Sequence, residues 1–435
     1  MTSSALYTDH YELTMVEAAM QSGTALRRSL FELFPRRLPT GRRYGVVAGV
    51  GRAMQVLRDF RFGEAELEFL REKKVVSAPV LDWLADYRFS GDVWGYAEGE
   101  IYFPGSPLVI VEGTFAEACI LETVLLSVYN YDSAVASAAS RMTLMAGDRP
   151  CIEMGARRAN EEAAVAAARA AYIVGFASTS NLEAGRRFGI PTAGTAAHSF
   201  TMLHDTERDA FEAQLTVQGK GTTLLLDTYS ISDAVRTAVD LAGPELGAVR
   251  IDSGDLAITA REVREQLDSL GATRTRIIVT SDLDEWQIGA LAAAPVDGYG
   301  VGTNLVIGSG HPTCGFVYKL VARATGNDPD APLAPVEKKA ANKATVGGRK
   351  YAVRRLNGQG IAEAEVIGVG VRPHSDTDDR PLLHPLVKSG EIVWDDDLQA
   401  ARTRHRAGLR ELPRAARKMS QGDPVIPTLY ESDYV

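Results

Sequence analysis

The sequence predicts an α/β protein whose core is an irregular or incomplete α/β barrel. Short apolar runs recur from about residue 150, helical segments separate most of them, and polar residues follow their ends. This alternation is typical of consecutive βα units, and eight such units can close into a barrel. The spacing of about 20 to 30 residues is tight for a regular barrel, so we expect an irregular one, with an open doubly wound sheet as the alternative.

The expected elements follow from the pattern of apolar residues along the chain. Eight candidate strands are the runs near 151–154, 172–177, 192–196, 222–227, 247–252, 276–280, 297–302 and 315–322. Helical segments between them include 161–171, 233–241, 257–270 and 284–293. This rhythm is absent before about residue 150 and stops after about 325, where a β-rich region with a basic helical stretch follows. We therefore divide the chain into segments 1–145, 146–325 and 326–435.

The composition is that of an ordinary folded, enzyme-sized protein. The 435 residues are 45% hydrophobic and 24% charged, which indicates two or three domains. A net charge of −9 gives no global attraction for nucleic acid or membrane surfaces, so an anionic ligand needs a local basic pocket. Three scattered cysteines indicate neither a disulfide framework nor a zinc site. The first Lys or Arg is Arg27 and no apolar run reaches the length of a membrane span, so a cytoplasmic protein is expected.

The ends of the predicted strands carry the residues that favour chemistry. In a barrel, the reacting groups lie where strands end and loops begin. Arginines, carboxylates, hydroxyls and glycines follow six of the runs, at 153–158, 194–199, 226–228, 250–255, 280–282 and 300–303. Glycines let the backbone approach phosphate oxygens closely. This inventory suits a phosphorylated, magnesium-chelated substrate.

These candidates differ in strength. Arg250 and Asp252 are charged residues near the end of a buried strand, which helix capping does not explain, so a functional role is favoured. Ser281–Asp284 also fits a helix capping box. The glycines of Gly300–Thr303 would equally let a strand and a helix pack, and His198 alone is as compatible with a structural role.

Several other enzyme classes lack their residues. Between residues 150 and 300 the only lysine is Lys220, in an expected loop, so a Schiff-base aldolase has no obvious nucleophile. The sequence contains no GxSxG, no HExxH and no P-loop GK[ST] motif. Serine hydrolases, zinc proteases and Walker ATPases are therefore disfavoured.

Taken together, the motifs resemble those of the nicotinate phosphoribosyltransferase family, whose members load nicotinate onto phosphoribosyl pyrophosphate in NAD salvage. The resemblance runs along the whole chain, through TDHYELTM at 8–15, FELFPRR at 31–37, EMGARR at 153–158, GTAAHS at 194–199, RIDSGD at 250–255 and GFVYKL at 315–320. The three motifs at 153–158, 194–199 and 250–255, in this order, are far more specific than any one of them.

The resemblance implies a type II phosphoribosyltransferase architecture, in which the irregular barrel of 146–325 is flanked by an α+β domain built from 1–145 and 326–435. It also implies a homodimer with shared active sites and an ATP-dependent, ligase-type enzyme. Mg²⁺ would be bound through the substrate phosphates, with its protein ligands unidentified. The expected partners are nicotinate, phosphoribosyl pyrophosphate and ATP.

The resemblance also assigns roles to individual residues. Tyr11 would stack on the nicotinate ring across the dimer interface, while Thr195 and Arg250 would hold the carboxylate side. His198 would be the catalytic histidine that becomes phosphorylated. The residues expected to bind the phosphates, ribose and magnesium are Arg157, Asp227, Asp252, Gly302 and Thr303, with Asp252 also counted as catalytic.

Three alternatives remain. Nicotinamide phosphoribosyltransferases resemble this chain but place an acid after the second strand to accept from the amide, whereas Ser178–Asn181 contains none. Nicotinate is therefore preferred. Quinolinate phosphoribosyltransferase ranks third, because it is shorter and would show more basic residues. A catalytically inactive barrel with a binding or regulatory role belongs to a different class, and the candidate residues at the strand ends oppose it.

Overall fold

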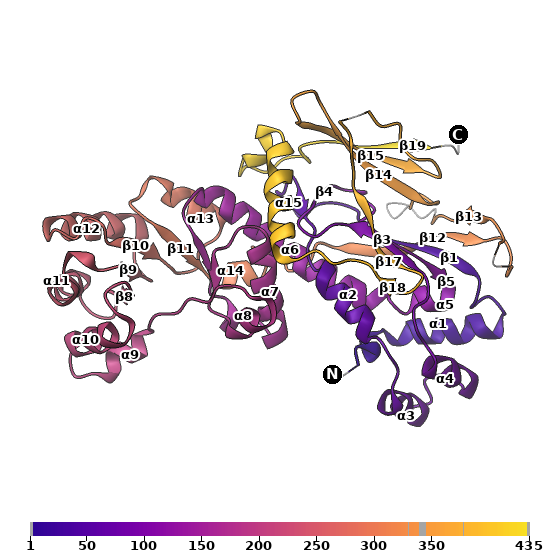
Figure 1. Cartoon of the computed structure of the whole chain (residues 1–435), viewed down its shortest axis with the longest axis horizontal. Helices are drawn as coiled ribbons and strands as arrows, with labels where there is room; N and C mark the ends of the chain where they lie inside the picture. The colour runs from indigo at the N-terminus through magenta and orange to yellow at the C-terminus, as the bar shows by residue number, and fades with distance from the viewer. Residues whose placement is uncertain (1–2, 329, 339–344, 377, 433–435) are drawn as a thin grey trace. The chain divides into compact units, whose positions relative to one another are not determined.

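The structure is a computed structural model that describes residues 3–328, 330–338, 345–376 and 378–432. It divides into two compact units (Figure 1). Residues 135–312 form one, which we call the parallel-sheet unit. Residues 1–134 and 313–435 form the other, the two-ended unit. The unit boundaries thus lie at 134 and 312, where the sequence analysis placed them at 145 and 325.

The parallel-sheet unit is built on one curled sheet that forms an incomplete barrel. Within 135–312, all of which the structure describes, the sheet has six strands, all parallel, in the order β7-β6-β11-β10-β9-β8. The strands are β6 (Cys151–Glu153), β7 (Ser178–Thr179), β8 (Thr223–Leu225), β9 (Ala248–Ile251), β10 (Arg276–Val279) and β11 (Gly298–Val301). The expectation of an irregular or incomplete α/β barrel is confirmed at this level.

Helices connect these strands. They are α7 (Glu161–Ile173), α8 (Leu182–Phe188), α9 (His198–Leu203), α10 (Glu207–Gln218), α11 (Ile231–Ala242), α12 (Leu256–Ser269), α13 (Glu285–Ala290) and α14 (Thr303–Val306), preceded by α6 (Glu122–Ala146). Side-chain caps fix several starts: Asp255 accepts from two backbone N–H groups of α12, and Asp284 accepts from Gln287 in α13. Ser281 does not cap α13. Its φ of 135° places it instead in a backbone conformation that favours glycine.

Two of the eight strand predictions were wrong, and a third strand, correctly predicted, belongs to the other unit. Residues 172–177 complete the last turn of α7 and the turn after it, because the buried end of an alanine-rich helix has the same apolar content as a strand. Residues 192–196 form a loop that contributes only an isolated bridge from Thr192 to Thr179. Residues 315–322 lie in β12 (Phe316–Ala324), which pairs antiparallel with β1 (Arg28–Pro35) in the two-ended unit.

The two-ended unit contains a seven-stranded and a four-stranded sheet among its described residues. The larger one has the order β13-β12-β1-β5-β3-β17-β18 and is antiparallel throughout. The smaller one has the order β16-β14-β15-β19. The strands not yet given are β2 (Gly45–Val46), β3 (Asp92–Tyr96), β4 (Ile101–Tyr102), β5 (Val109–Thr114), β13 (Leu333–Pro335), β14 (Lys350–Leu356), β15 (Ala362–Val369), β16 (Arg380–Pro381), β17 (Leu383–Lys388), β18 (Glu391–Ile392) and β19 (Thr428–Ser432).

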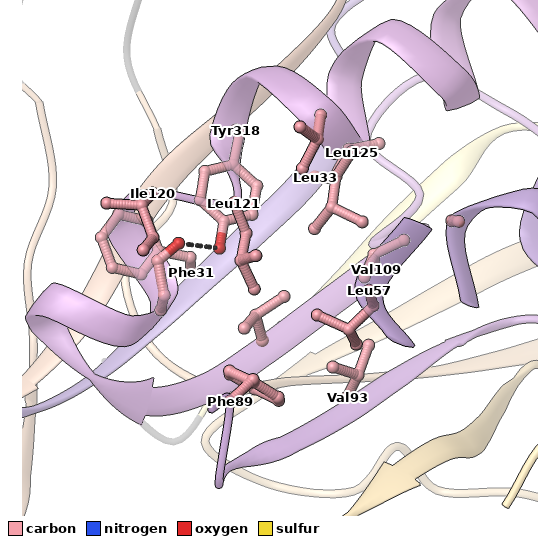
Figure 2. Close-up of a cluster of buried hydrophobic side chains, with 14 of the residues drawn as sticks. Phe31, Leu33, Leu57, Phe89, Val93, Val109, Ile120, Leu121, Leu125 and Tyr318 are labelled. Atoms are coloured by element: carbon pink, nitrogen blue, oxygen red, sulfur yellow. Dashed lines mark hydrogen bonds between the residues drawn. The ribbon is translucent and has the colours of Figure 1, made fainter. Parts of the chain in front are cut away.

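Helices pack on these sheets around a large apolar core. They are α1 (His10–Gln21), α2 (Val50–Asp59), α3 (Glu64–Glu72), α4 (Ala78–Ala85), α5 (Phe115–Cys119) and α15 (Leu398–Glu411), together with the first half of α6. Figure 2 shows part of the core, where Phe31 stacks on Tyr318 with ring centroids 5.0 Å apart. The Tyr318 hydroxyl donates to the carbonyl of Ala118, at 2.8 Å. Residues from β1 and β12, nearly 290 positions apart in the sequence, thus share one core.

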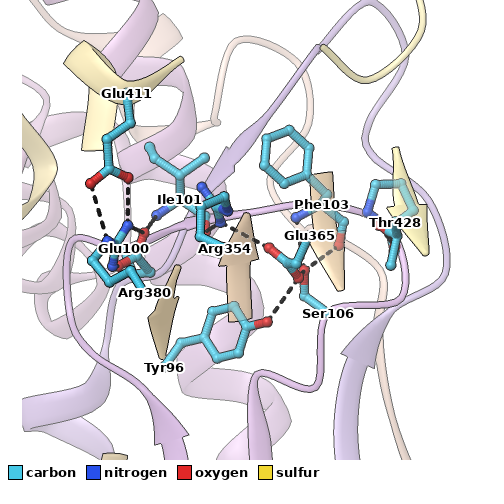
Figure 3. A network of polar contacts seen from close by, with 11 residues as sticks. Tyr96, Glu100, Ile101, Phe103, Ser106, Arg354, Glu365, Arg380, Glu411 and Thr428 are labelled. Carbon is cyan, nitrogen blue, oxygen red and sulfur yellow. Dashed lines mark hydrogen bonds and ion pairs between the residues drawn. The ribbon is translucent and has the colours of Figure 1, made fainter. Parts of the chain in front are cut away.

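A buried network of charges joins the smaller sheet to the rest of the two-ended unit (Figure 3). Arg354 and Glu365 form an ion pair at 2.8 Å with both side chains fully buried. Glu365 also accepts from Tyr96 and Ser106. Arg380 pairs with Glu100 and Glu411.

The described helices include none with the length and apolarity that a bilayer-spanning segment needs.

Candidate active site

A cavity of about 760 Å³ lies in the parallel-sheet unit along the sheet and at the carboxyl ends of its strands. The strand-end rule predicted this location. Its lining contains six residues that the sequence singled out: Arg157, Thr195, Arg250, Asp252, Gly302 and Thr303. Arg158, Ser180, Ser281 and Asp282 also line it. Basic, acidic and hydroxyl side chains therefore converge on one hollow.

His198 and two carboxylates form a group beside this cavity. His198 is the first residue of α9, and its Nε2 lies 3.9 Å from Asp227 Oδ1 and 3.9 Å from Asp252 Oδ2. Its Nδ1 lies 3.1 Å from Thr228 Oγ1. The strands β8 and β9 are neighbours in the sheet, which brings Asp227 and Asp252 together from positions 25 residues apart.

The two carboxylates differ in their surroundings. Asp227 is 2% exposed, and its Oδ2 accepts from the Asp252 backbone N–H at 3.1 Å and from Ser253 Oγ at 2.5 Å. Its Oδ1 has no hydrogen-bond donor among the described residues. Asp252 is 33% exposed and accepts from Thr280 Oγ1. Since Asp227 Oδ1 is buried and unpaired, it has the chemistry of a cation ligand or a ligand-facing acceptor.

Arg250 lines the cavity from β9, the strand next to the sheet edge. Its strand alternates, so that Val249 and Ile251 are fully buried on one face while Arg250 points to the other. The guanidinium donates to Thr195 Oγ1 at 3.2 Å and to the Ala196 carbonyl at 3.0 Å, while its Nε is buried without an acceptor among the described residues. Burial lowers the pKa of Arg250. An arginine with an unused donor inside a cavity is suited to bind an anion.

Gly302 lines the cavity, and the turn that contains Gly155 packs closely against it. A Cβ on Gly155 would lie 2.3 Å from Val306 Cγ1 and 2.9 Å from the Gly302 carbonyl, so only glycine fits there. This close packing brings the turn after β6, with Arg157, next to the start of α14 at Thr303. Among the described residues, no group of three or more His, Cys, Asp or Glu is placed to hold a metal ion.

Tyr11 belongs to the other unit. It lies on α1 of the two-ended unit and is 43% exposed. Burial and the neighbouring carboxylates of Glu122 and Glu12 raise the pKa of its hydroxyl. Its stacking role stays a prediction.

Sequence reasoning assigned no role to one buried carboxyl next to the cavity. Glu153, the last residue of β6, is 0% exposed. Burial raises its pKa, although Thr179 and the Gly155 backbone N–H donate to it. The signal was present, because an acid at the end of an apolar run is unusual in the same way as Asp252.

Comparisons with known proteins match nearly the whole chain. The family model described as the nicotinate phosphoribosyltransferase (NAPRTase) N-terminal domain matches residues 6–130, and the model of the NAPRTase family matches residues 150–332. Nicotinate phosphoribosyltransferase pncB1 of Mycobacterium tuberculosis is 52% identical, over 98% of this chain and 95% of its own. The enzymes named nicotinate phosphoribosyltransferase from Bacillus subtilis and Homo sapiens are 35% and 31% identical, over 88% and 98% of this chain and 80% and 89% of theirs.

Solved structures agree with these sequence matches. The crystal structure of human nicotinic acid phosphoribosyltransferase aligns with a TM-score of 0.82 and 26% identity, covering 98% of this chain and 97% of its own. A structure of nicotinate-nucleotide pyrophosphorylase from Pyrococcus furiosus aligns with a TM-score of 0.76 and 22% identity, covering 93% and 94%. The second match supports the fold alone.

Proposed function

Because this chain belongs to the nicotinate phosphoribosyltransferase family and is such an enzyme of NAD salvage, we propose that it couples transfer to ATP through His198. The reaction moves the phosphoribosyl group of phosphoribosyl pyrophosphate to the ring nitrogen of nicotinate, giving nicotinate mononucleotide and pyrophosphate. The observation that carries the proposal is the group formed by His198, Asp227 and Asp252, with His198 Nε2 at 3.9 Å from both carboxylates.

The geometry supports Nε2 of His198 as the nitrogen that accepts the phosphoryl group. If Nδ1–H donates to Thr228 Oγ1, the Nε2 lone pair is free to attack the γ-phosphorus of ATP. The N–P bond forms as the bond to the bridging oxygen breaks and ADP leaves. The new group would carry about two negative charges beside two carboxylates, so it would favour binding of a cation there. The free energy of ATP hydrolysis would thus be used through the phosphorylated form of His198, and ATP itself would not take part in the transfer step.

The remaining assignments follow the chemistry of the transfer. The pyridine nitrogen of nicotinate carries a lone pair, so it needs no general base to attack the ribose carbon. The difficult part is the departure of pyrophosphate from a cation-like ribose, which arginines and carboxylates around the bond assist. We assign Arg157, Asp227, Gly302 and Thr303 to phosphoribosyl pyrophosphate, and Asp252 to the developing positive charge.

Nicotinate would be held by three side chains. Arg250 and Thr195 already contact each other across the cavity, and the unpaired Arg250 Nε is available to the carboxylate. Tyr11 would supply the aromatic face. Since holding two reactants in line is worth about 7–11 kcal/mol in favourable cases, these contacts contribute to rate as well as to affinity.

Mg²⁺ fits the acceptors that the site offers. The buried, unpaired Oδ1 of Asp227 and the partly exposed carboxylate of Asp252 are hard oxygen ligands, and substrate phosphates would supply the others. A bound Mg²⁺ would neutralise the charge that develops on the pyrophosphate oxygens.

We also propose a homodimer in which Tyr11 serves the partner's site. Tyr11 and Met15 lie four positions apart on α1 and are 43% and 38% exposed, and Tyr7, in the 3-10 turn that precedes α1, is 73% exposed. Exposed apolar side chains gathered in this segment favour a covered surface. The cytoplasmic location expected from the sequence stays a prediction.

The nicotinamide-specific alternative is less well supported. Ser178–Asn181 contains no carboxylate, and Asn181 is used to cap α8 by accepting from Ala184. Glu153, which accepts from Thr179 of this segment, is fully buried. An amide therefore finds no exposed acid acceptor in this loop, whereas a carboxylate meets no repulsion there. A catalytically inactive barrel would form no mononucleotide from nicotinate and phosphoribosyl pyrophosphate.

The test is ATP hydrolysis and transfer by His198→Ala, with His204→Ala as a control histidine outside the carboxylate pair. We expect His198→Ala to lose the ATP hydrolysis that nicotinate and phosphoribosyl pyrophosphate stimulate, while keeping a slow transfer independent of ATP with poorer substrate affinity. ATP hydrolysis that still keeps step with product would refute the phosphohistidine. Complete loss of transfer in a folded variant would make His198 essential to the chemical step.

A further inference from the structure

Glu153 is a buried acid without an ionic partner among the described residues of the parallel-sheet unit. Its side chain is 0% exposed, and no basic side chain pairs with it among the described residues. It lies at the end of β6, between β7 and β11 in the sheet. Burying a carboxyl without an ionic partner lowers the stability of the folded state, and a neutral side chain of similar size would fill the same space at a smaller cost in free energy. Burial accordingly raises its pKa.

The two oxygens of Glu153 hold two different loops. Oε1 accepts from the Gly155 backbone N–H at 2.5 Å, in the turn that continues into Arg157 and Arg158. Oε2 accepts from Thr179 Oγ1, at the end of β7. Both arginines line the cavity. One carboxyl therefore ties the arginine-bearing turn to the neighbouring strand.

The second loop is fixed by a chain of hydrogen bonds that starts at the same residue. The Glu153 backbone carbonyl accepts from the Ser180 N–H at 2.8 Å, and Thr179 Oγ1 accepts from the Asn181 N–H at 2.9 Å. Ser180 lines the cavity, and Asn181 begins α8. The backbone bonds belong to the fold, but the link between the two loops passes through the Glu153 side chain.

We propose that Glu153 is a positioning residue, which sets the place of Arg157 and Arg158 through Gly155 and of the Ser180 loop through Thr179, and so controls capture of phosphoribosyl pyrophosphate. This rests on the proposed binding role of Arg157. Glu153 touches no substrate in this arrangement. Its contribution is to limit the positions that the two arginines adopt before the substrate arrives.

Glutamine at position 153 would preserve both links without a charge. Its carbonyl can accept from the Gly155 N–H, and its amide can donate to Thr179 Oγ1, whose hydrogen is free to turn. Alanine removes both links. Thr179→Val removes one link at the opposite end while leaving Glu153 intact.

The test measures KM for phosphoribosyl pyrophosphate, kcat and Tm in Glu153→Ala, Glu153→Gln and Thr179→Val. We expect KM to rise about tenfold or more in Glu153→Ala and about fivefold in Thr179→Val, with kcat changed less, and to stay within about threefold of the parent in Glu153→Gln. Thr143→Val is the matched control, because Thr143 donates to the Val174 carbonyl and lines no part of the cavity. It should lower Tm at most.

Each result decides the proposal. An unchanged KM in folded Glu153→Ala overturns it, and if that variant does not fold, an unchanged KM in Thr179→Val does so. A Glu153→Gln variant as impaired as Glu153→Ala would mean that charge matters, not position, and would also overturn it. Failure of the binding role of Arg157 is distinct, because Arg157→Ala would then leave KM for phosphoribosyl pyrophosphate unchanged.

Discussion

Replacing Arg250 by lysine separates the shape of the guanidinium from its charge. Arg250 donates to Thr195 Oγ1 at 3.2 Å and to the Ala196 carbonyl at 3.0 Å, and its buried Nε has no acceptor among the described residues. An ammonium group keeps the positive charge but lacks the planar fork that serves several acceptors at once. The 195–196 loop and the nicotinate carboxylate would then compete for one donor group.

The size of the effect follows from these contacts. A hydrogen bond from a charged donor contributes about 1.5–3 kcal/mol. If lysine makes only one of the two contacts with the protein, the site loses one charged hydrogen bond, which is worth about 1.5–3 kcal/mol of transition-state binding. Because each 1.4 kcal/mol is a factor of ten, kcat/KM for nicotinate should fall about 10- to 100-fold.

The assay is steady-state turnover of nicotinate and nicotinamide with the parent and with Arg250→Lys, together with Tm. Arg276→Lys is the control, since Arg276 begins β10 and is exposed. We expect the nicotinate activity to fall and the Arg276 variant to match the parent. Unchanged kinetics for both substrates in Arg250→Lys would remove Arg250 from the site.

Three further predictions concern the two-ended unit. Tyr11→Ala should raise KM for nicotinate without lowering Tm, because the Tyr11 side chain is 43% exposed. Mixed dimers that combine a Tyr11→Ala chain with an Asp252→Asn chain should recover one working site. No recovery would indicate a site within one chain. Arg354→Met should lower the free energy of unfolding by about 3–5 kcal/mol in a denaturant titration, because it strands the buried Glu365 (Figure 3), and an unchanged midpoint would contradict this. Burial lowers the pKa of His405 from 6.5 to about 4, so the unfolded state binds the extra proton first and stability should fall as pH drops from 6.5 towards 4, by at most about 1.4 kcal/mol per pH unit. His405→Gln should flatten that slope in Tm measurements, and an equal slope would refute it.

The sequence predicted the parallel strands that combine apolar runs with a polar end. The runs at 151–154, 222–227, 247–252, 276–280 and 297–302 each contain an observed strand. The prediction of strands in the parallel sheet failed where apolar residues are buried by other partners. Tyr172 and Ile173 are buried at the end of α7 and not in a strand. The run from Phe316 does form a strand, but it pairs with a strand nearly 290 residues earlier and not with the parallel sheet. Periodicity alone records burial and does not record which partner causes it.

The candidate site was predictable where the strand-end rule applies. Arg157, Arg250 and Asp252 follow or end strands, and the structure places all three on one cavity, although their roles towards substrate stay predictions. Glu153 was missed because its function depends on donors 2 and 26 residues away, and no sequence spacing shows that they meet one carboxyl. Tyr11 was predicted from the resemblance, but a single chain cannot test its role, because that role depends on a second chain.

Parallel assays of the purified protein with nicotinate, nicotinamide and quinolinate test which substrate the enzyme uses. Each reaction contains phosphoribosyl pyrophosphate and Mg²⁺, with and without ATP, and the mononucleotide product is quantified. We predict turnover of nicotinate that ATP stimulates, with nicotinamide and quinolinate used far more slowly or not at all. Equal or faster use of nicotinamide, or no product from any of the three, would contradict the account.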